Sequence, residues 1–198
     1  MQFRNISQEN ETVYTLKENE RCVFFLFNRS GRITFELSGI NAEARIFAFF
    51  IGRDTEKHSL QIIQNHRAPK TISHILIKSV VSDEAVCIYD GTIFIHKDAQ
   101  GSNASQESRA ILLSSNALVS MKPTLEILAS DVICNHKATT SPLNQEALFF
   151  AETRGLSLAQ AETLLLSGFW NDAVKKMADL GVKIKETENI RKIVKNDN

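Results

Sequence analysis

Short apolar runs follow one another from Cys22 to His136, and this rhythm restricts the fold more than any other feature of the sequence. Each run is rich in Val, Ile, Leu and Phe and too short for an amphipathic helix, which is typical of β-strands. The expected strands are Cys22 to Phe27, Arg32 to Leu37, Ala44 to Ile51, Leu60 to Ile63, His74 to Val81, Ala85 to Tyr89, Thr92 to His96, Ala110 to Leu113, Ala117 to Met121, Thr124 to Leu128 and Asp131 to His136.

This succession excludes a doubly wound α/β sheet and leaves a sandwich, a barrel or a stacked β-solenoid. Two features favour the solenoid. The runs at residues 45–50 and 110–113 are apolar on both faces, as in parallel sheets that are covered on both sides. Hairpin dipeptides such as Asn-Gly are missing, although Asp90-Gly91 fits one tight turn. No fixed repeat period is visible, so the pattern alone leaves the three architectures open.

The sequence changes character after His136, where helical signals begin. Ser141 and Pro142 fit the N-cap and first turn of a helix, and Gly155 fits its end. Ser157 opens a second helix through a capping box, and the apolar residues that follow it repeat every three or four positions. We therefore expect a β core over residues 1–140 and a helical domain over residues 141–198.

Two further segments carry local predictions. The charged segment 183–198 fits a third, partly frayed helix. The polar stretch 100–107 is predicted to be a loop.

Composition restricts the partners and the compartment. Lys plus Arg number 23 and Asp plus Glu number 23, so no net charge draws the chain to nucleic acid or to an anionic membrane. The three cysteines, Cys22, Cys87 and Cys134, are too widely spaced for a disulfide framework or a zinc ribbon, which favours a reducing compartment. No apolar run approaches the roughly 18 residues of a spanning helix, and the N-terminus is polar. We expect a cytoplasmic protein without a signal peptide or membrane anchor.

One local cluster has ligand chemistry. Cys134 and His136 are two apart on an expected strand, so a thiolate and an imidazole point the same way and can face one iron or zinc ion. Two ligands do not complete a site, and a partner chain or neighbouring strands must supply the rest. The alternative is that Cys134 is a small buried hydrophobe and His136 a hydrogen-bonded histidine at a strand end.

An aromatic pair on the second expected helix is a candidate anchor for a partner. Phe169 and Trp170 are of the kind that fills a partner's groove. Packing of this helix against the β core is the alternative, and the helical periodicity favours it. Enzymatic motifs such as Gly-x-Ser-x-Gly, Gly-x-x-x-x-Gly-Lys and His-Glu-x-x-His are missing, which favours a protein that is not an enzyme.

The segment from Ile88 to Trp170 resembles the C-terminal core of the SufB/SufD family of iron-sulfur cluster assembly proteins. Order, spacing and residue types agree over about 80 residues, whereas the preceding part agrees only in its strand texture. The matching pieces include residues 91–95, 98–100, 108–114, 122–127, 131–140, 148–150, 154–155 and 164–169.

The resemblance implies a right-handed parallel β-helix followed by a small C-terminal α-helical domain. It also implies that SufB-like and SufD-like chains pair through their β-helices and that the helical domain holds a SufC-type ATPase, for which Phe149, Gly168, Phe169 and Trp170 are the candidate contacts. Cys134 and His136 match the Cys-x-His of the SufD branch. They become candidate ligands of iron or a transient iron-sulfur cluster shared with a partner, with no cofactor bound tightly.

Two departures qualify this assignment. Residues 138–141 are closer to the SufB branch than to the SufD branch. Lys137 stands where SufD relatives usually have Gly and SufB relatives Glu, which is expected to put a cation beside the proposed ligands and weaken metal binding.

The leading hypothesis is a SufD-like scaffold subunit that pairs with a SufB-like chain, or with a second copy of itself, and binds a SufC-type ATPase. The alternatives are a metal-dependent enzyme that uses Cys134 and His136, with Glu126 as a further carboxylate, or a stand-alone β-solenoid binding module.

Overall fold

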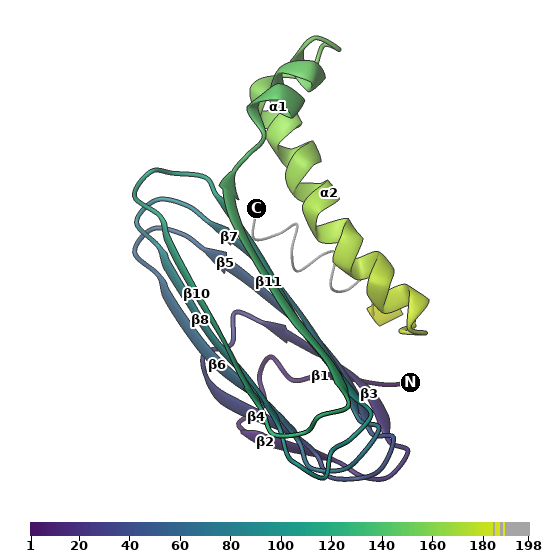
Figure 1. The fold of residues 1–198 in the computed structure, drawn as a ribbon. Helices are drawn as coiled ribbons and strands as arrows, with labels where there is room; N and C mark the ends of the chain where they lie inside the picture. Colours follow the sequence, from purple (N-terminus) through teal and green to yellow (C-terminus); the bar gives the residue numbers. More distant parts are fainter. Residues whose placement is uncertain (184, 187, 189–198) are drawn as a thin grey trace.

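The computed structural model describes residues 1–183, 185–186 and 188, and parallel β-strands form most of it (Figure 1). The strands alternate between two sheets, and every strand pairs in parallel with its neighbours. One sheet, called here sheet A, has the order β1 (Gln2–Asn5), β3 (Arg21–Phe27), β5 (Glu43–Gly52), β7 (Ile72–Val81), β9 (Ser102–Leu112) and β11 (Val132–Pro142). Sheet B has the order β10 (Leu118–Ile127), β8 (Val86–Ile95), β6 (Lys57–His66), β4 (Gly31–Leu37) and β2 (Val13–Leu16).

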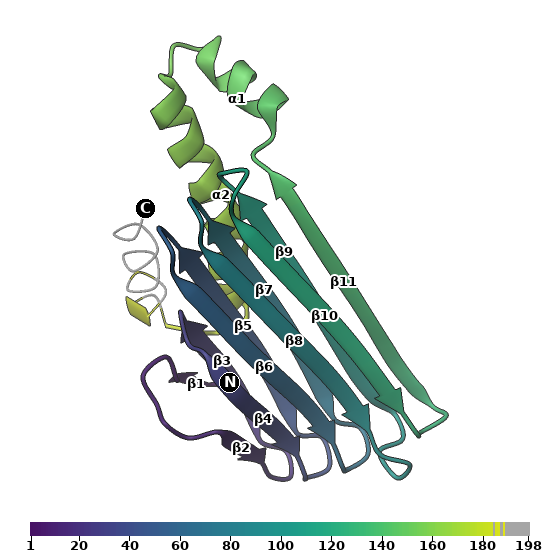
Figure 2. The same cartoon turned by 90° about the vertical axis from the view of Figure 1, so that its left-hand side faces the viewer.

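The chain winds from one sheet to the other and back, so successive coils stack into a β-solenoid (Figure 2). This confirms the expected fold class. Hydrogen bonds between stacked positions join residues 22 or 23 apart in the first coils and 29 to 31 apart in the later ones. Because the coils differ in length, the sequence shows no fixed repeat.

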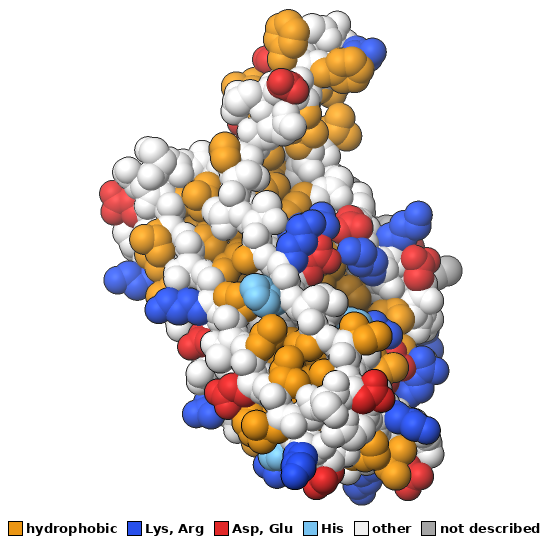
Figure 3. Space-filling view, in the orientation of Figure 1, with side chains coloured by type: hydrophobic (Ala, Val, Ile, Leu, Met, Phe, Trp, Pro, Cys, Tyr) orange, Lys and Arg blue, Asp and Glu red, His pale blue; other side chains and the backbone are white. Residues whose placement is uncertain are grey.

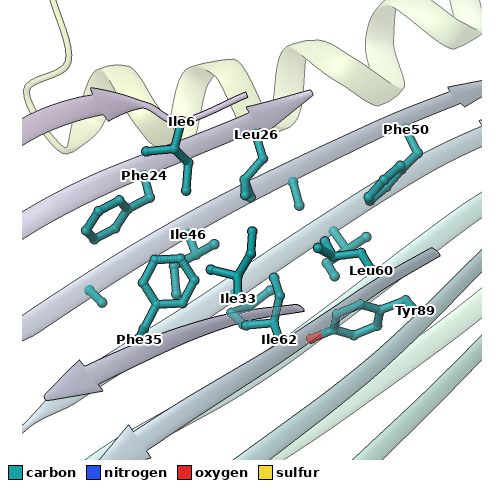
Figure 4. Packing of buried hydrophobic residues seen from close by; sticks show 14 of the residues in the cluster. Ile6, Phe24, Leu26, Ile33, Phe35, Ile46, Phe50, Leu60, Ile62 and Tyr89 are labelled. Carbon is teal, nitrogen blue, oxygen red and sulfur yellow. The ribbon is translucent and has the colours of Figure 1, made fainter. Parts of the chain in front are cut away.

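Apolar side chains from the inner faces of both sheets fill the solenoid (Figure 4). In the first coils Tyr14, Phe24 and Phe35 form an aromatic cluster, with ring centroids 4.8 to 5.5 Å apart. Ile46 and Ile62 continue this core into the next coil. Each fully buried side chain of this size contributes about 1.5–3 kcal/mol, so this inner stack is the main stabilising element of the fold.

The corner between sheet B and sheet A has the same backbone conformation in each coil. Asn19, Asn41, Lys70 and Gly101 all have a positive φ, which Asn and Gly adopt more easily than most residues. The backbone N–H of each donates to a carbonyl in the following coil at 2.6 to 3.4 Å. The corners therefore stack in register, as the strands do.

Two helices follow the last strand. Helix α1 (Gln145–Glu152) begins after Asn144, whose side chain accepts a hydrogen bond from the N–H of Ala147. Helix α2 (Leu158–Asp179) begins with the expected capping box, formed by Ser157 and Gln160. Within the described residues, no helix is long and apolar enough to cross a membrane.

Helix α2 packs on the outer face of sheet A and makes a second apolar core with it. Trp170 contacts Phe49 of β5 with ring centroids 5.1 Å apart, and Val174 and Met177 are fully buried beside it. The remainder of α2, together with α1, projects past the end of the sheet (Figure 2). We call this projecting part, α1 and residues 158–168, the helical tip.

The predicted helix start at Ser141 and Pro142 is wrong. Both residues continue β11, where they pair in register with Ile111 and Leu112 of β9. Asn144 provides the N-cap instead, because its carboxamide reaches a free N–H of the first turn.

The predicted loop over residues 100–107 is also wrong beyond its first two residues, because β9 begins at Ser102. Its inward residues Ser102, Ala104, Gln106 and Ser108 are buried although mostly polar, so the apolar alternation of a strand is missing. The expected third helix falls mostly on residues outside the described ones. The division of the chain at residue 140 stays a prediction.

The predicted tight turn at Asp90-Gly91 lies inside β8, where Gly91 points into the solenoid. A Cβ atom there would lie 2.3 Å from the hydroxyl of Tyr89 and 2.7 Å from Oε1 of Gln106. Glycine is therefore required for space in the strand interior rather than for a turn. The expected runs 85–89 and 92–96 are one strand for this reason, and the runs 117–121 and 124–128 likewise form β10.

Candidate functional site at the open end

The last coil leaves both sheets with an unpaired edge. In the described part of the chain, β10 pairs only with β8 and β11 only with β9, so each presents a row of free backbone groups. Apolar side chains lie exposed along this end, over strands β10 and β11 (Figure 3). They are Leu118, Leu125, Ile127, Leu128 and Ile133. This open end is a surface on which another chain can pack.

Strand β11 brings Cys134 and His136 to the same face, the one that points toward β10. Their partners in register are Ala104 and Gln106, which are buried inside the solenoid. Lys137 is on the opposite face, where it is in register with Glu107 and borders helix α2. The Lys137 ammonium therefore lies on the other face of β11 from the two proposed ligands.

Cys134 and His136 differ in their surroundings. Cys134 packs partly against the small apolar cluster that contains Ile93, Ile95 and Ala104, and burial raises the pKa of its thiol. A raised pKa disfavours the thiolate that a metal needs, so the isolated chain holds Cys134 mainly as a thiol. The imidazole of His136 is exposed. The last coil thus presents an exposed histidine next to a partly buried thiol.

The structure supplies no third ligand. Among the described residues, no group of three or more His, Cys, Asp or Glu side chains is arranged to hold a metal ion. Glu126 lies in the outward row of β10, in register with Phe94, and so does not join Cys134 and His136. The described residues alone therefore do not complete the coordination of an iron ion or a cluster at this end.

A buried polar network that the sequence analysis missed lies behind His136. Gln106 donates to Oε1 of Gln64 at 3.0 Å, and Gln64 donates to the hydroxyl of Ser73 at 2.5 Å. His66 is hydrogen-bonded to the Ser73 and Thr71 hydroxyls, both at 2.7 Å. Burial, with a smaller contribution from His74, lowers the pKa of His66 to about 4. The sequence signal was the alternation of small and polar residues from Ser102 onward, typical of a strand with a polar inner face.

The helical tip is the second exposed surface. Phe149 is 67% exposed, and Phe150, Leu158 and Leu164 are also more than half exposed. A groove of about 470 Å³ lies between α1 and α2 and is lined mainly by apolar residues. The guanidinium of Arg154 lies 3.5 Å above the Phe150 ring at its rim. Hydrophobic side chains gather at this tip in Figure 3.

The three consecutive candidates on α2 lie in different environments. Gly168 is exposed, with no other atoms within 4 Å of the place a Cβ would take. Phe169 is half-buried, and Trp170 is only 3% exposed because it packs on Phe49. The aromatic pair thus contacts the chain's own sheet, in agreement with the alternative that this helix packs against the β core. Packing on the sheet leaves almost none of the Trp170 side chain accessible to a partner. A partner contact through Trp170 stays a prediction.

A buried lysine fastens α2 to sheet A. Lys78 of β7 is 1% exposed and donates to a carboxylate oxygen of Asp172 at 3.1 Å and to the backbone carbonyl of Phe169. Its ammonium group also lies 4.3 Å from the centre of the Phe169 ring. Burial lowers the pKa of Lys78, although Asp172 opposes the shift. This contact fixes the rotation of α2 on the sheet, because the ammonium must find its partners on one side of the helix.

The fold and these two surfaces define a parallel β-solenoid protein with an open last coil and a projecting helical tip. The family model described as "SUF system FeS cluster assembly, SufBD core domain" matches residues 28–169. The chain belongs to the SufBD family of iron-sulfur cluster assembly proteins.

Individual relatives agree with this assignment. The chain is 33% identical to the iron-sulfur cluster assembly protein SufD of Bacillus subtilis over 144 residues, which is 73% of this chain and 32% of that protein. It is 30% identical to the chloroplastic protein ABCI7 of Arabidopsis thaliana over 150 residues, 75% of this chain and 31% of that one. It is 29% identical to the SufBD family protein slr0076 of Synechocystis, over 96% of this chain and 49% of that one. The chain thus spans from just under a third to about a half of the length of these relatives.

Proposed function

We propose that this chain is a scaffold subunit of iron-sulfur cluster assembly, without catalytic turnover of its own. It pairs with a SufB-like chain through the open end of the solenoid and binds a SufC-type ATPase through the helical tip. The observation that carries the proposal is the position of Cys134 and His136 on the edge strand of an uncovered coil. An incomplete pair of ligands at an open edge is useful only where a second chain completes it.

The open end supports pairing because it combines backbone and apolar groups. An edge strand of eleven residues offers main-chain hydrogen bonds to an added strand. Ile133 on β11 and Leu128 beside β10 are both more than 60% exposed. Their burial under a partner chain would contribute about 1.5–3 kcal/mol each.

The helical tip supports a separate contact. Leu164 and Gly168 lie one turn apart on the exposed face of α2, and Leu164 lines the same groove as Phe150 of α1. A glycine inside a helix is about 1 kcal/mol less favourable than alanine, and the packing of this chain does not require one at residue 168. A partner that approaches the helix closely at this point would account for it.

Co-expression with a SufB-like chain and a SufC-type ATPase tests the proposal, with one variant for each surface. Phe149→Ser is expected to lose the ATPase and keep the SufB-like chain. Ile133→Ser is expected to lose the SufB-like chain and keep the ATPase. The matched control is Val13→Ser, which removes an exposed apolar side chain on β2, away from both surfaces.

Failure of the wild-type chain to co-purify with either partner would refute the proposal. Loss of both partners in the control variant would show that the losses reflect folding instead. Gly168→Leu provides a second test of the tip. It should leave the unfolding temperature unchanged or raise it, because the position is open, while it weakens the ATPase contact.

A further inference from the structure

The two edges of the open end are protected to different degrees against unspecific pairing. Strand β10 carries Pro123 in its interior, and a proline has no N–H to give to an added strand. Strand β11 has its proline only at its last residue, Pro142. Proline is one of the residues by which natural proteins blunt exposed edges. Of the two edges, β11 is therefore the one left able to accept a strand.

The single formal charge on β11 is at its centre. Lys137 is the middle residue of the eleven from Val132 to Pro142, and the others are apolar, neutral polar or histidine. Its side chain is exposed and has no ion pair within the described residues. The natural candidate to neutralise it is Glu107, its neighbour in register on β9.

Glu107 is already engaged by other cations. One of its oxygens lies 2.5 Å from a guanidinium nitrogen of Arg109, and the other lies 3.8 Å from the ammonium of Lys176. The outer face near the edge therefore has an excess of positive charge that the described residues do not balance. The next strand in the sheet is the place from which a compensating charge can come.

The two-fold symmetry of a homodimer restricts which strand can pair with β11. When two copies of one strand pair antiparallel over their full length, the central residue faces its own copy. Lys137 would then lie opposite Lys137 of a second molecule. Like charges that face each other across two strands destabilise the pair, whereas opposite charges stabilise it.

We propose that Lys137 selects the partner of the open end: it disfavours a second copy of this chain and favours a different chain that places an Asp or Glu opposite it on the strand added to β11. The inference rests on the proposed function in taking β11 as the pairing edge. It goes further in naming the residue that discriminates between partners and the charge of the group that it recognises.

A charge swap within this chain tests the inference without any other partner. The Lys137→Glu variant is prepared alone and mixed with wild type, and association is measured by sedimentation equilibrium at about 0.15 M salt. Wild type and variant should each remain monomeric, since like charges face in both cases. The mixture should associate about tenfold more tightly than either chain alone. Hydrogen exchange should show new protection of residues 132–142 in the mixture.

The matched control is Lys175→Glu, which makes the same charge change on the exposed face of α2. Its mixture with wild type should remain monomeric. The inference is wrong if the Lys137→Glu mixture associates no better than its components, if the control mixture associates equally well, or if wild type alone pairs through β11. Co-purification with a SufB-like chain tests the proposed function separately, so failure of the inference can be distinguished from failure of the proposed function.

Discussion

Acid should destabilise the folded chain through a single buried histidine. His66 is fully buried with both ring nitrogens hydrogen-bonded to hydroxyl groups, and its pKa falls from 6.5 to about 4 on folding. Because the folded state has the lower pKa, the unfolded chain takes up the proton first as the pH falls. Stability contributed by this residue is therefore constant above about pH 6.5 and lost progressively between 6.5 and 4.

The size of the loss follows from the shift. One pKa unit corresponds to about 1.4 kcal/mol, so the whole shift amounts to about 3 kcal/mol, of which about 2 kcal/mol is lost between pH 7.5 and pH 5. Burial also lowers the pKa of His74 to about 4, which adds to the loss in the same direction. His74 is more accessible to solvent, and its contribution is correspondingly screened.

Urea unfolding at pH 7.5 and pH 5, followed by circular dichroism, measures the effect. The wild-type chain should lose about 2 kcal/mol more between these two pH values than the His66→Gln variant does. The His96→Gln variant, which changes a histidine on the outer side of the coil, should lose as much as wild type. An equal loss in wild type and His66→Gln would refute the reasoning.

Three further predictions concern the packing and the site. Gly91→Ala should destabilise the chain by about 1–3 kcal/mol in urea unfolding, since the new methyl group overlaps neighbouring side chains, whereas Gly168→Ala at an open position should not. Asp172→Ala should lower the free energy of unfolding by about 1–3 kcal/mol, because it leaves the buried Lys78 ammonium without its carboxylate partner. Lys78→Met should lower it by less than about 1 kcal/mol, and the reverse order would contradict this account. His136→Ala should abolish the visible absorption of a cluster reconstituted anaerobically with a SufB-like chain, and a spectrum equal to wild type would argue against a shared site.

Much of the fold could be predicted because several of its strands are apolar on both faces. Residues 44–51 form such a run, since the solenoid interior covers one face of β5 and helix α2 the other. The capping box at Ser157 was equally clear, because it depends only on residues close in sequence. Strand β9 escaped prediction because its inward residues are polar and are satisfied by hydrogen bonds from other coils. The local sequence does not identify these partners, because they lie in other coils.

The repeat itself was detectable at the corners rather than in the strands. Asn41 and Lys70 have the same left-handed backbone, as do Asp54 and Asp83 at the opposite corner. A search for turn residues recurring at the coil length would have revealed the stacking that variable strands concealed.

Strand alternation predicted correctly that Cys134 and His136 share a face, and the same rule places Lys137 on the other one. The sequence could not decide how Trp170 is used. An apolar stripe on a helix is compatible with packing on the chain's own sheet and with packing on a partner. Only the position of α2 over β5 distinguishes the two.

Helix α2 is a single rod of 22 residues, about 33 Å long, with one half seated on sheet A and the other half standing free. A continuous helix transmits a push along its length, and Ser167 and Gly168, where the two halves meet, are residues at which a helix bends more readily. A force on the free half acts on the contact of Trp170 with β5 and on the contact of Asp172 with Lys78 of β7, which are three and two strands away from β11 in the sheet. A force applied at the helical tip is therefore transmitted to the sheet whose edge strand β11 forms the open end.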